Sequence, residues 1–206
     1  MTKSLGKLMI ILSGLIGLVL VIGLYFIRSE REQKKSAGPE PAVLFESSTE
    51  KETTGYAVPD DDLVATLVKA LPDVEEFLQI CLDEKKGDAS DFKGYLVAYP
   101  VMERDGKSLY FVRPTLEPYC STLYGAHAFK FWFLQRDAGK NPSKYRLVLD
   151  SGADIAEVVA SVHHGQNDIK TQYCVADGCE VRIFHFNGYA YWAAENYFEK
   201  NTMADK

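Results

Sequence analysis

The sequence predicts an α+β fold in which an N-terminal transmembrane helix is followed by a helical element and then by an antiparallel β-meander of about seven strands. Three observations lead to this prediction. They are a run of twenty residues without a charge near the amino terminus, a stretch of helical periodicity after residue 60, and alternating apolar residues with hairpin turns over the remainder.

The uncharged run is residues 8–27, LMIILSGLIGLVLVIGLYFI, and its length matches one helical crossing of a lipid bilayer. A cleaved signal peptide would end in small residues at its cleavage site, whereas this run leads through aromatic residues to Arg28. We therefore expect an uncleaved signal anchor. Ser13 and Gly17 have the spacing of small residues that lets two membrane helices approach closely, so a homodimer through these residues is an alternative to a monomer.

The orientation of this anchor depends on two opposing signals. More Lys and Arg residues follow the run than precede it, which favours a cytoplasmic domain. A short head is the usual cytoplasmic end of a signal anchor, however, and the cysteines downstream fit an oxidising compartment. We expect a cytoplasmic head over 1–7, a polar linker over 28–58 and an extracytoplasmic domain over 59–206, on a single-pass protein of a bacterial inner membrane.

The charges are unevenly distributed along the chain. Residues 1–35 hold six of the 23 Lys and Arg residues and two of the 29 Asp and Glu residues, which leaves 17 basic and 27 acidic residues in 36–206. Such a domain repels phosphate backbones, so we expect no nucleic-acid partner. The acidity suits a basic protein partner outside the cytoplasm, although it also serves solubility.

All four cysteines, Cys81, Cys120, Cys174 and Cys179, follow the apolar run, and an even number outside the cytoplasm predicts two disulfides. Four residues separate Cys174 from Cys179 and include the turn dipeptide Asp177-Gly178. A loop of this length places the two cysteines opposite each other at the neck of a hairpin. Cys81 then pairs with Cys120 by elimination.

The helical element is predicted from Asp60–Asp62, which supply an N-cap, and from apolar residues at helical spacing between Leu63 and Leu71. Pro72 interrupts this helix, and residues 73–84 form a second piece with one apolar stripe.

Strands are predicted from Phe92 onward, where apolar residues alternate. Residues 155–162 could be a strand or a short helix. The predicted hairpins pair 95–101 with 109–112 and 126–134 with 145–149; a meander follows over 168–175, 179–186 and 189–193, with its last turn at Asn187-Gly188, and 194–200 closes as a helical turn.

The histidines provide the one candidate for catalysis. His127, His164 and Asp168 are the alternative catalytic residues, with His185 beside them if their strands are neighbours, although adjacent residues such as His163 and His164 point to opposite faces of a strand. No zincin helix, no nucleophile elbow and no zinc-knuckle spacing of cysteines is present. We therefore expect no metal and no cofactor, and a binding protein rather than an enzyme.

Aromatic residues are abundant, with 12 Tyr, 11 Phe and 2 Trp. Tyr189, Tyr191 and Trp192 put large rings on both faces of one predicted strand. Because Tyr and Trp are favoured anchors at protein interfaces, these three are the candidate binding residues. Alternating aromatic residues chiefly form a half-buried sheet face, which is the competing interpretation of these rings.

Four stretches follow one another between Leu116 and Trp192: YGAHAFKFWFL, YRLVLDSGAD, HGQNDIKT and FHFNGYAYW. Together they resemble a blade-like β-meander of secreted and periplasmic bacterial proteins of unknown function. The resemblance implies a binding module, since several proteins of this shape bind other proteins and some small anchored envelope proteins are inhibitors or immunity proteins against secreted effectors. It implies no catalytic residues.

The leading hypothesis is a membrane-anchored envelope protein whose acidic extracytoplasmic domain binds another protein. An inhibitor or immunity protein against a secreted effector is one version of this function. The alternatives are an envelope enzyme with a site at His127, His164 and Asp168, and a scaffold or assembly subunit that acts through its membrane helix.

Overall fold

The computed structural model describes residues 40–48, 55–84, 91–125, 128–137 and 145–201. From Ala42 onward these residues belong to one unit. The predicted transmembrane segment 8–27, with Ser13 and Gly17, lies outside the described residues. No helix in the described part of the chain is long and apolar enough to cross a membrane.

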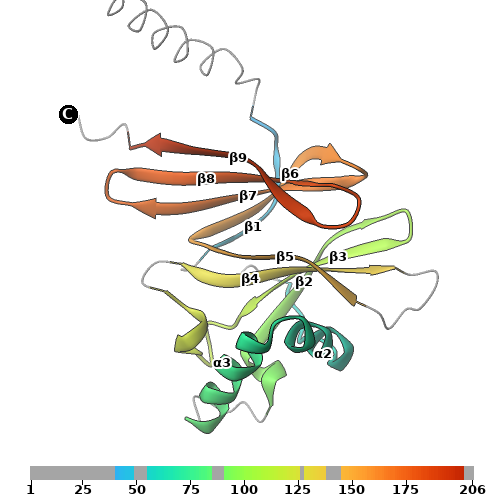
Figure 1. The fold of residues 1–206 in the computed structure, drawn as a ribbon, viewed down its shortest axis with the longest axis vertical. Coiled ribbons are helices and arrows are strands. Elements are labelled where there is room, and N and C mark those ends of the chain that lie inside the picture. Colours follow the sequence, from blue (N-terminus) through green and yellow to red (C-terminus); the bar gives the residue numbers. More distant parts are fainter. Residues whose placement is uncertain (1–39, 49–54, 85–90, 126–127, 138–144, 202–206) are drawn as a thin grey trace, which may run out of the picture. The chain divides into compact units, whose positions relative to one another are not determined.

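The described residues form two antiparallel sheets and two α-helices (Figure 1), which confirms an α+β fold built on β-meanders. The five-stranded sheet has the order β1-β6-β7-β8-β9, and the four-stranded sheet has the order β2-β3-β4-β5. The elements are β1 (Val43–Ser48), α2 (Asp61–Ala70), α3 (Pro72–Asp83), the 3₁₀ helix η1 (Phe92–Tyr95), β2 (Leu96–Arg104), β3 (Lys107–Pro114), the 3₁₀ helix η2 (Ser121–Leu123), β4 (Phe129–Asp137), β5 (Tyr145–Ala153), β6 (Ile155–His163), β7 (Gln166–Val175), β8 (Gly178–Phe186) and β9 (Tyr191–Lys200).

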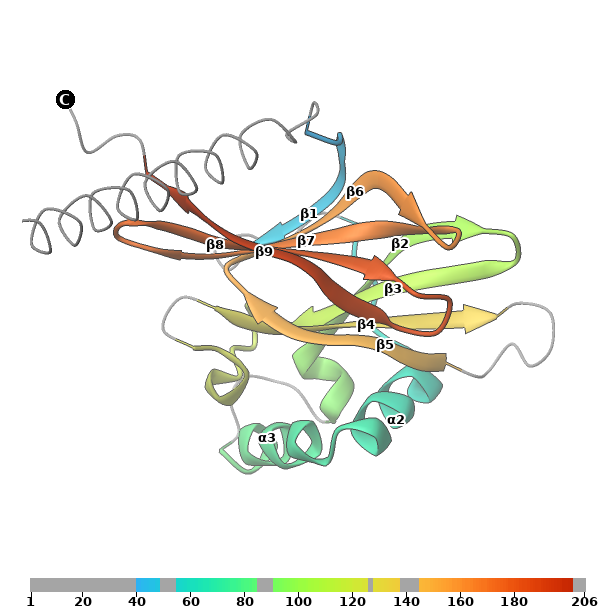
Figure 2. The same cartoon turned by 45° about the horizontal axis from the view of Figure 1, so that its top comes forward.

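The unit has three layers, with the four-stranded sheet between the five-stranded sheet and the helices (Figure 2). Alternation along β4 explains this arrangement. Phe131 and Phe133 face the five-stranded sheet and pack in the core between the two sheets, whereas Trp132 faces α2 and α3. All three rings are fully buried. A sheet covered on both faces therefore forms the centre of the unit.

Both predicted helices are present, with bounds within about two residues of the predicted ones. The carboxylate of Asp60 caps α2 by accepting the N–H of Leu63 at 2.8 Å. Pro72 opens α3, where its missing N–H costs no helical hydrogen bond. The apolar stripes of both helices, including Leu67 and Leu78, pack against the four-stranded sheet.

Two segments differ from the sequence prediction. β1 lies within 28–58, the predicted polar linker, and pairs with β6, so the described fold begins before residue 59 and has nine strands rather than about seven. The helical turn predicted over 194–200 is wrong. These residues continue β9, and their pairing with β8 as far as Gly178 supplies the hydrogen bonds that a helix would otherwise make.

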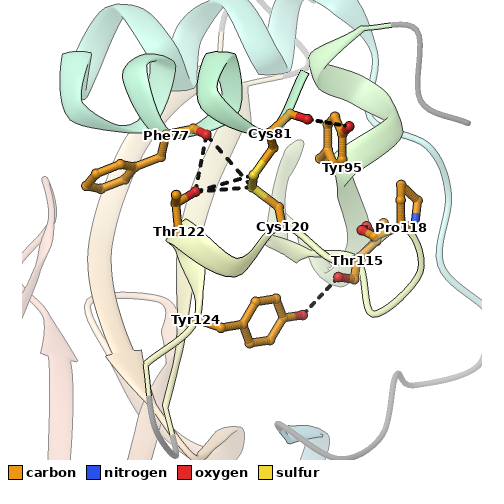
Figure 3. Close-up of a disulfide and its surroundings, with 8 residues drawn as sticks. All are labelled: Phe77, Cys81, Tyr95, Thr115, Pro118, Cys120, Thr122 and Tyr124. Carbon is orange, nitrogen blue, oxygen red and sulfur yellow. Dashed lines mark hydrogen bonds between the residues drawn. A yellow bond between two sulfur atoms is a disulfide. The ribbon is translucent and has the colours of Figure 1, made fainter. Parts of the chain in front are cut away.

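Both disulfides are present, with the pairing that the sequence predicts. Cys174 and Cys179 face each other across the β7–β8 hairpin. Cys81 of α3 is bonded to Cys120, which precedes η2 (Figure 3). The Thr122 hydroxyl donates to the carbonyl oxygen of Phe77 at 3.2 Å, next to the two bridged sulfurs. This disulfide therefore fixes the loop before β4 to the outer helix layer.

Candidate functional site

The turn between β8 and β9 lies at one end of the five-stranded sheet and is stabilised by side-chain hydrogen bonds. The side-chain oxygen of Asn187 accepts the backbone N–H groups of Tyr189 and Ala190, each at 2.9 Å. Gly188 follows Asn187 with a φ of +94°, a conformation that glycine adopts without strain. The Asn-Gly dipeptide that predicted a turn thus builds it by a local side-chain hydrogen bond.

Tyr189 presents its ring to solvent from this turn. It is 71% exposed, more than any other large hydrophobic side chain among the described residues. Arg146 of β5 holds it in place, because the guanidinium group lies 4.5 Å from the ring centroid and also donates to the backbone oxygen of Tyr189. Arg146 in turn donates to the side-chain oxygen of Gln135 at 2.5 Å. The exposed ring is therefore positioned by both sheets.

Trp192 and Tyr191 point to opposite faces of β9, so the prediction that all three aromatic residues form a binding surface is wrong for Tyr191. Trp192 is 52% exposed, whereas Tyr191 is buried against Phe133 and Phe186. The Tyr191 hydroxyl donates to the backbone oxygen of Asn167 at 2.9 Å. Burial, aided by the charge of Asp168, raises the pKa of Tyr191 above its usual value. Tyr191 is therefore a core residue.

We call Tyr189 and Trp192, the two exposed rings at the β8–β9 end of the five-stranded sheet, the aromatic corner. Beside it, three polar side chains converge from three neighbouring strands: His163 at the end of β6, Asp168 on β7 and His185 on β8. We call them the His–Asp–His cluster. The rings of Trp192 and His185 make a T-shaped contact, with centroids 6.2 Å apart and planes at 87°.

The cluster is built around a buried carboxylate. The Asp168 side chain is only 1% exposed, and its two oxygens lie 2.7 and 2.9 Å from Nδ1 of His163. Nε2 of His185 lies 3.7 Å from the same carboxylate. The two imidazole rings stack, with centroids 3.6 Å apart and planes at 12°. Two groups that can carry protons or bind metals thus face one buried anion.

The structure changes which histidines accompany Asp168. His164 does not join the cluster, since it lies with Gly165 in the tight turn between β6 and β7, exposed and with a φ of +49°. His127, the other predicted partner, lies outside the described residues. Sequence reasoning named Asp168 and His185 but chose His164 over His163, because the end of β6 could not be placed from its pattern.

Comparison of the chain with protein-family models, with curated proteins and with solved structures found no match. The aromatic corner and the His–Asp–His cluster are therefore interpreted from their own geometry.

Proposed function

We propose that this protein is a single-pass, membrane-anchored envelope protein whose acidic domain binds another protein outside the cytoplasm through the aromatic corner. The observation that supports this proposal is the exposure of Tyr189 and Trp192, at 71% and 52%, although neighbouring residues fix both rings. Exposed rings that are already held in place are available to a partner that covers them.

The aromatic corner has the physical properties of an interface anchor. Covering the exposed part of each ring would gain on the order of 3 kcal/mol, from about 25 cal/mol per Å² of apolar surface. The ordering cost is small, because Arg146 and Asn187 already hold the loop and its ring. Tyr and Trp are the residues that most often carry binding energy at protein interfaces.

The net negative charge of the domain indicates the kind of partner that we expect. The 27 acidic and 17 basic residues after residue 35 leave the extramembrane part acidic. A complementary partner has an apolar pocket with basic residues around it, because opposite potentials steer the two surfaces together. A secreted effector with a basic cleft has this character, and an inhibitor or immunity protein anchored in the membrane would meet it on arrival.

The two disulfides support the extracytoplasmic placement. Such bonds persist in oxidising compartments and are rare in the cytoplasm of mesophiles. The apolar run 8–27 supplies the anchor in this proposal, with residues 1–7 in the cytoplasm and the bilayer as the second partner of the chain.

The test is capture from intact cells with a membrane-impermeant cross-linker, using the full-length protein tagged after Lys206 and identification by mass spectrometry. We expect specific recovery of one exported or secreted protein, and its loss in Tyr189→Ser and Trp192→Ser. Removal of such an anchor costs about 2 kcal/mol or more, or about 30-fold in affinity. Tyr173→Ser is the matched control, since Tyr173 is 42% exposed but lies beside the Cys174–Cys179 disulfide, at the other end of the sheet.

Two results would contradict the proposal. Recovery of cytoplasmic or membrane-embedded proteins alone would indicate that the protein acts through its membrane helix or that its topology is inverted. Equal capture by the wild type, Trp192→Ser and Tyr173→Ser would show that the aromatic corner is not the contact surface.

A further inference from the structure

The His–Asp–His cluster lies on the face of the five-stranded sheet that points away from the core. Ile169, Phe184 and Phe186 pack in the core between the sheets. Because successive residues of a strand alternate between faces, Asp168 and His185 emerge on the opposite face. Among the described residues, this cluster is the one group of three His, Cys, Asp or Glu side chains placed to hold an ion.

The distances within the cluster match those between ligands of one small cation. Two ligands of a tetrahedral zinc ion, each about 2.1 Å from the metal, lie about 3.4 Å apart. In the cluster the Asp168 carboxylate lies 2.7 Å from Nδ1 of His163 and 3.7 Å from Nε2 of His185, which brackets that value. All three ligand atoms lie within 4.8 Å of one another.

Electrostatics favours a cation at the same point. A carboxylate that is 1% exposed pays a large desolvation cost, which an opposite charge must offset. The His163 ring contacts this carboxylate at hydrogen-bond distance, and a divalent ion between the three side chains would bring a full opposite charge and use the lone pairs of both rings.

From this geometry we propose that His163, Asp168 and His185 bind one divalent transition-metal ion of the zinc type. Two imidazole nitrogens and one carboxylate oxygen form a donor set that suits Zn²⁺ and its neighbours in the first transition row. Mg²⁺ and Ca²⁺ require mostly oxygen ligands and are not expected to compete. The ion displaces the Nδ1 proton of His163, and water completes the coordination.

Binding requires one local movement. The two stacked rings must rotate away from each other, because a metal binds in the plane of each imidazole and the ring centroids are only 3.6 Å apart. His163 is the ring that turns, since its side chain is 44% exposed and stands at the end of β6. His185 stays in place between Asp168 and Trp192. This proposal does not depend on the protein-binding function.

The test uses the full-length protein in detergent micelles, carrying a histidine-free tag and stripped of metals with a chelator. Zn²⁺ is titrated by calorimetry against a competing chelator, and Co²⁺ is followed by its visible absorption and by quenching of Trp192 fluorescence. We expect one site per chain, and binding at least about tenfold weaker in His163→Gln and in His185→Gln. His164→Asn is the matched control and should bind as the wild type does, because asparagine tolerates the positive φ of that turn.

Thermal unfolding followed by circular dichroism checks that each variant folds, and His163 is exposed enough for its replacement to be tolerated. No saturable Zn²⁺ binding by the wild type would overturn the proposal and leave the cluster as a hydrogen-bonded group. Unchanged Zn²⁺ affinity in both folded glutamine variants would overturn it as well, and so would equal weakening by His164→Asn.

Discussion

The disulfide between Cys81 and Cys120 is expected to contribute about twice as much stability as the one between Cys174 and Cys179. The first closes a loop with a sequence separation of 39, and the second a loop with a separation of 5. In the chain-entropy model, the constraint on the unfolded state grows with the logarithm of loop length, giving about 4 kcal/mol for the first bond and about 2 kcal/mol for the second.

The fold adds to this difference. Cys174 and Cys179 already face each other in the register of β7 and β8, so the strand ladder keeps them together without the bond. Cys81 and Cys120 are both fully buried, and their bond connects α3 with the loop before η2. The double variant Cys81→Ala/Cys120→Ala thus also removes two buried sulfur atoms from the helix layer.

Equilibrium urea unfolding of the full-length protein measures both effects, with the fluorescence of buried Trp132 as the signal. We expect a loss of about 4 kcal/mol in Cys81→Ala/Cys120→Ala and about 2 kcal/mol in Cys174→Ala/Cys179→Ala, with the unfolding slope checked for a change in the denatured state. Equal losses, or the larger loss in the hairpin variant, would refute the loop-length reasoning.

Three further predictions concern the core, one glycine and the pH dependence of stability. Phe111→Ala should cost about 4 kcal/mol in urea unfolding, because its fully buried ring packs among four other Phe rings and Tyr99; a loss below about 1 kcal/mol would contradict that packing. Gly178→Ala should lower the melting temperature far more than Gly188→Ala. A Cβ at Gly178 would lie 2.1 Å from a backbone oxygen of β9, whereas a Cβ at Gly188 meets nothing within 4 Å. Equal changes in melting temperature would argue against this close approach. Burial raises the pKa of both Tyr145 and Tyr191, so the stability due to their protonated form is complete below about pH 10 and lost as the pH rises further. Urea unfolding measured at increasing pH should show a shallower decline in the free energy of unfolding for Tyr191→Phe than for the wild type. The same pH dependence in both proteins would contradict the assignment.

Local sequence signals predicted the hairpins well because the residues that decide a turn are neighbours. Asp105-Gly106, a dipeptide typical of hairpin turns, adopts the two positive φ angles of a tight turn between β2 and β3. The Cys174–Cys179 pair follows from its short loop in the same way. Such features need no knowledge of the rest of the fold.

Elements that depend on distant partners were harder to predict. β1 is a short apolar run in polar surroundings, and only its pairing with β6 makes it a strand. Residues 194–200 have helix-forming residues such as Ala194 and Glu195, but pairing with β8 overrides their local preference.

The candidate site was partly predictable for the same reason. Alternation guarantees that Tyr191 and Trp192 face opposite sides of β9, yet only the packing of Phe133 and Phe186 determines which of them is buried. Likewise, the end of β6 decides that His163 rather than its neighbour faces Asp168. Arg146, which fixes the exposed ring of the turn, comes from the other sheet and leaves no local signal.

The most direct test of the proposed binding surface is photo-cross-linking in intact cells, with Tyr189 replaced by p-benzoylphenylalanine in the full-length protein. The p-benzoylphenylalanine at position 189 should yield one discrete adduct with an exported protein, and the same residue at position 173 should yield none. No adduct at position 189, or the same adducts from both positions, would contradict the assignment of protein binding to the aromatic corner.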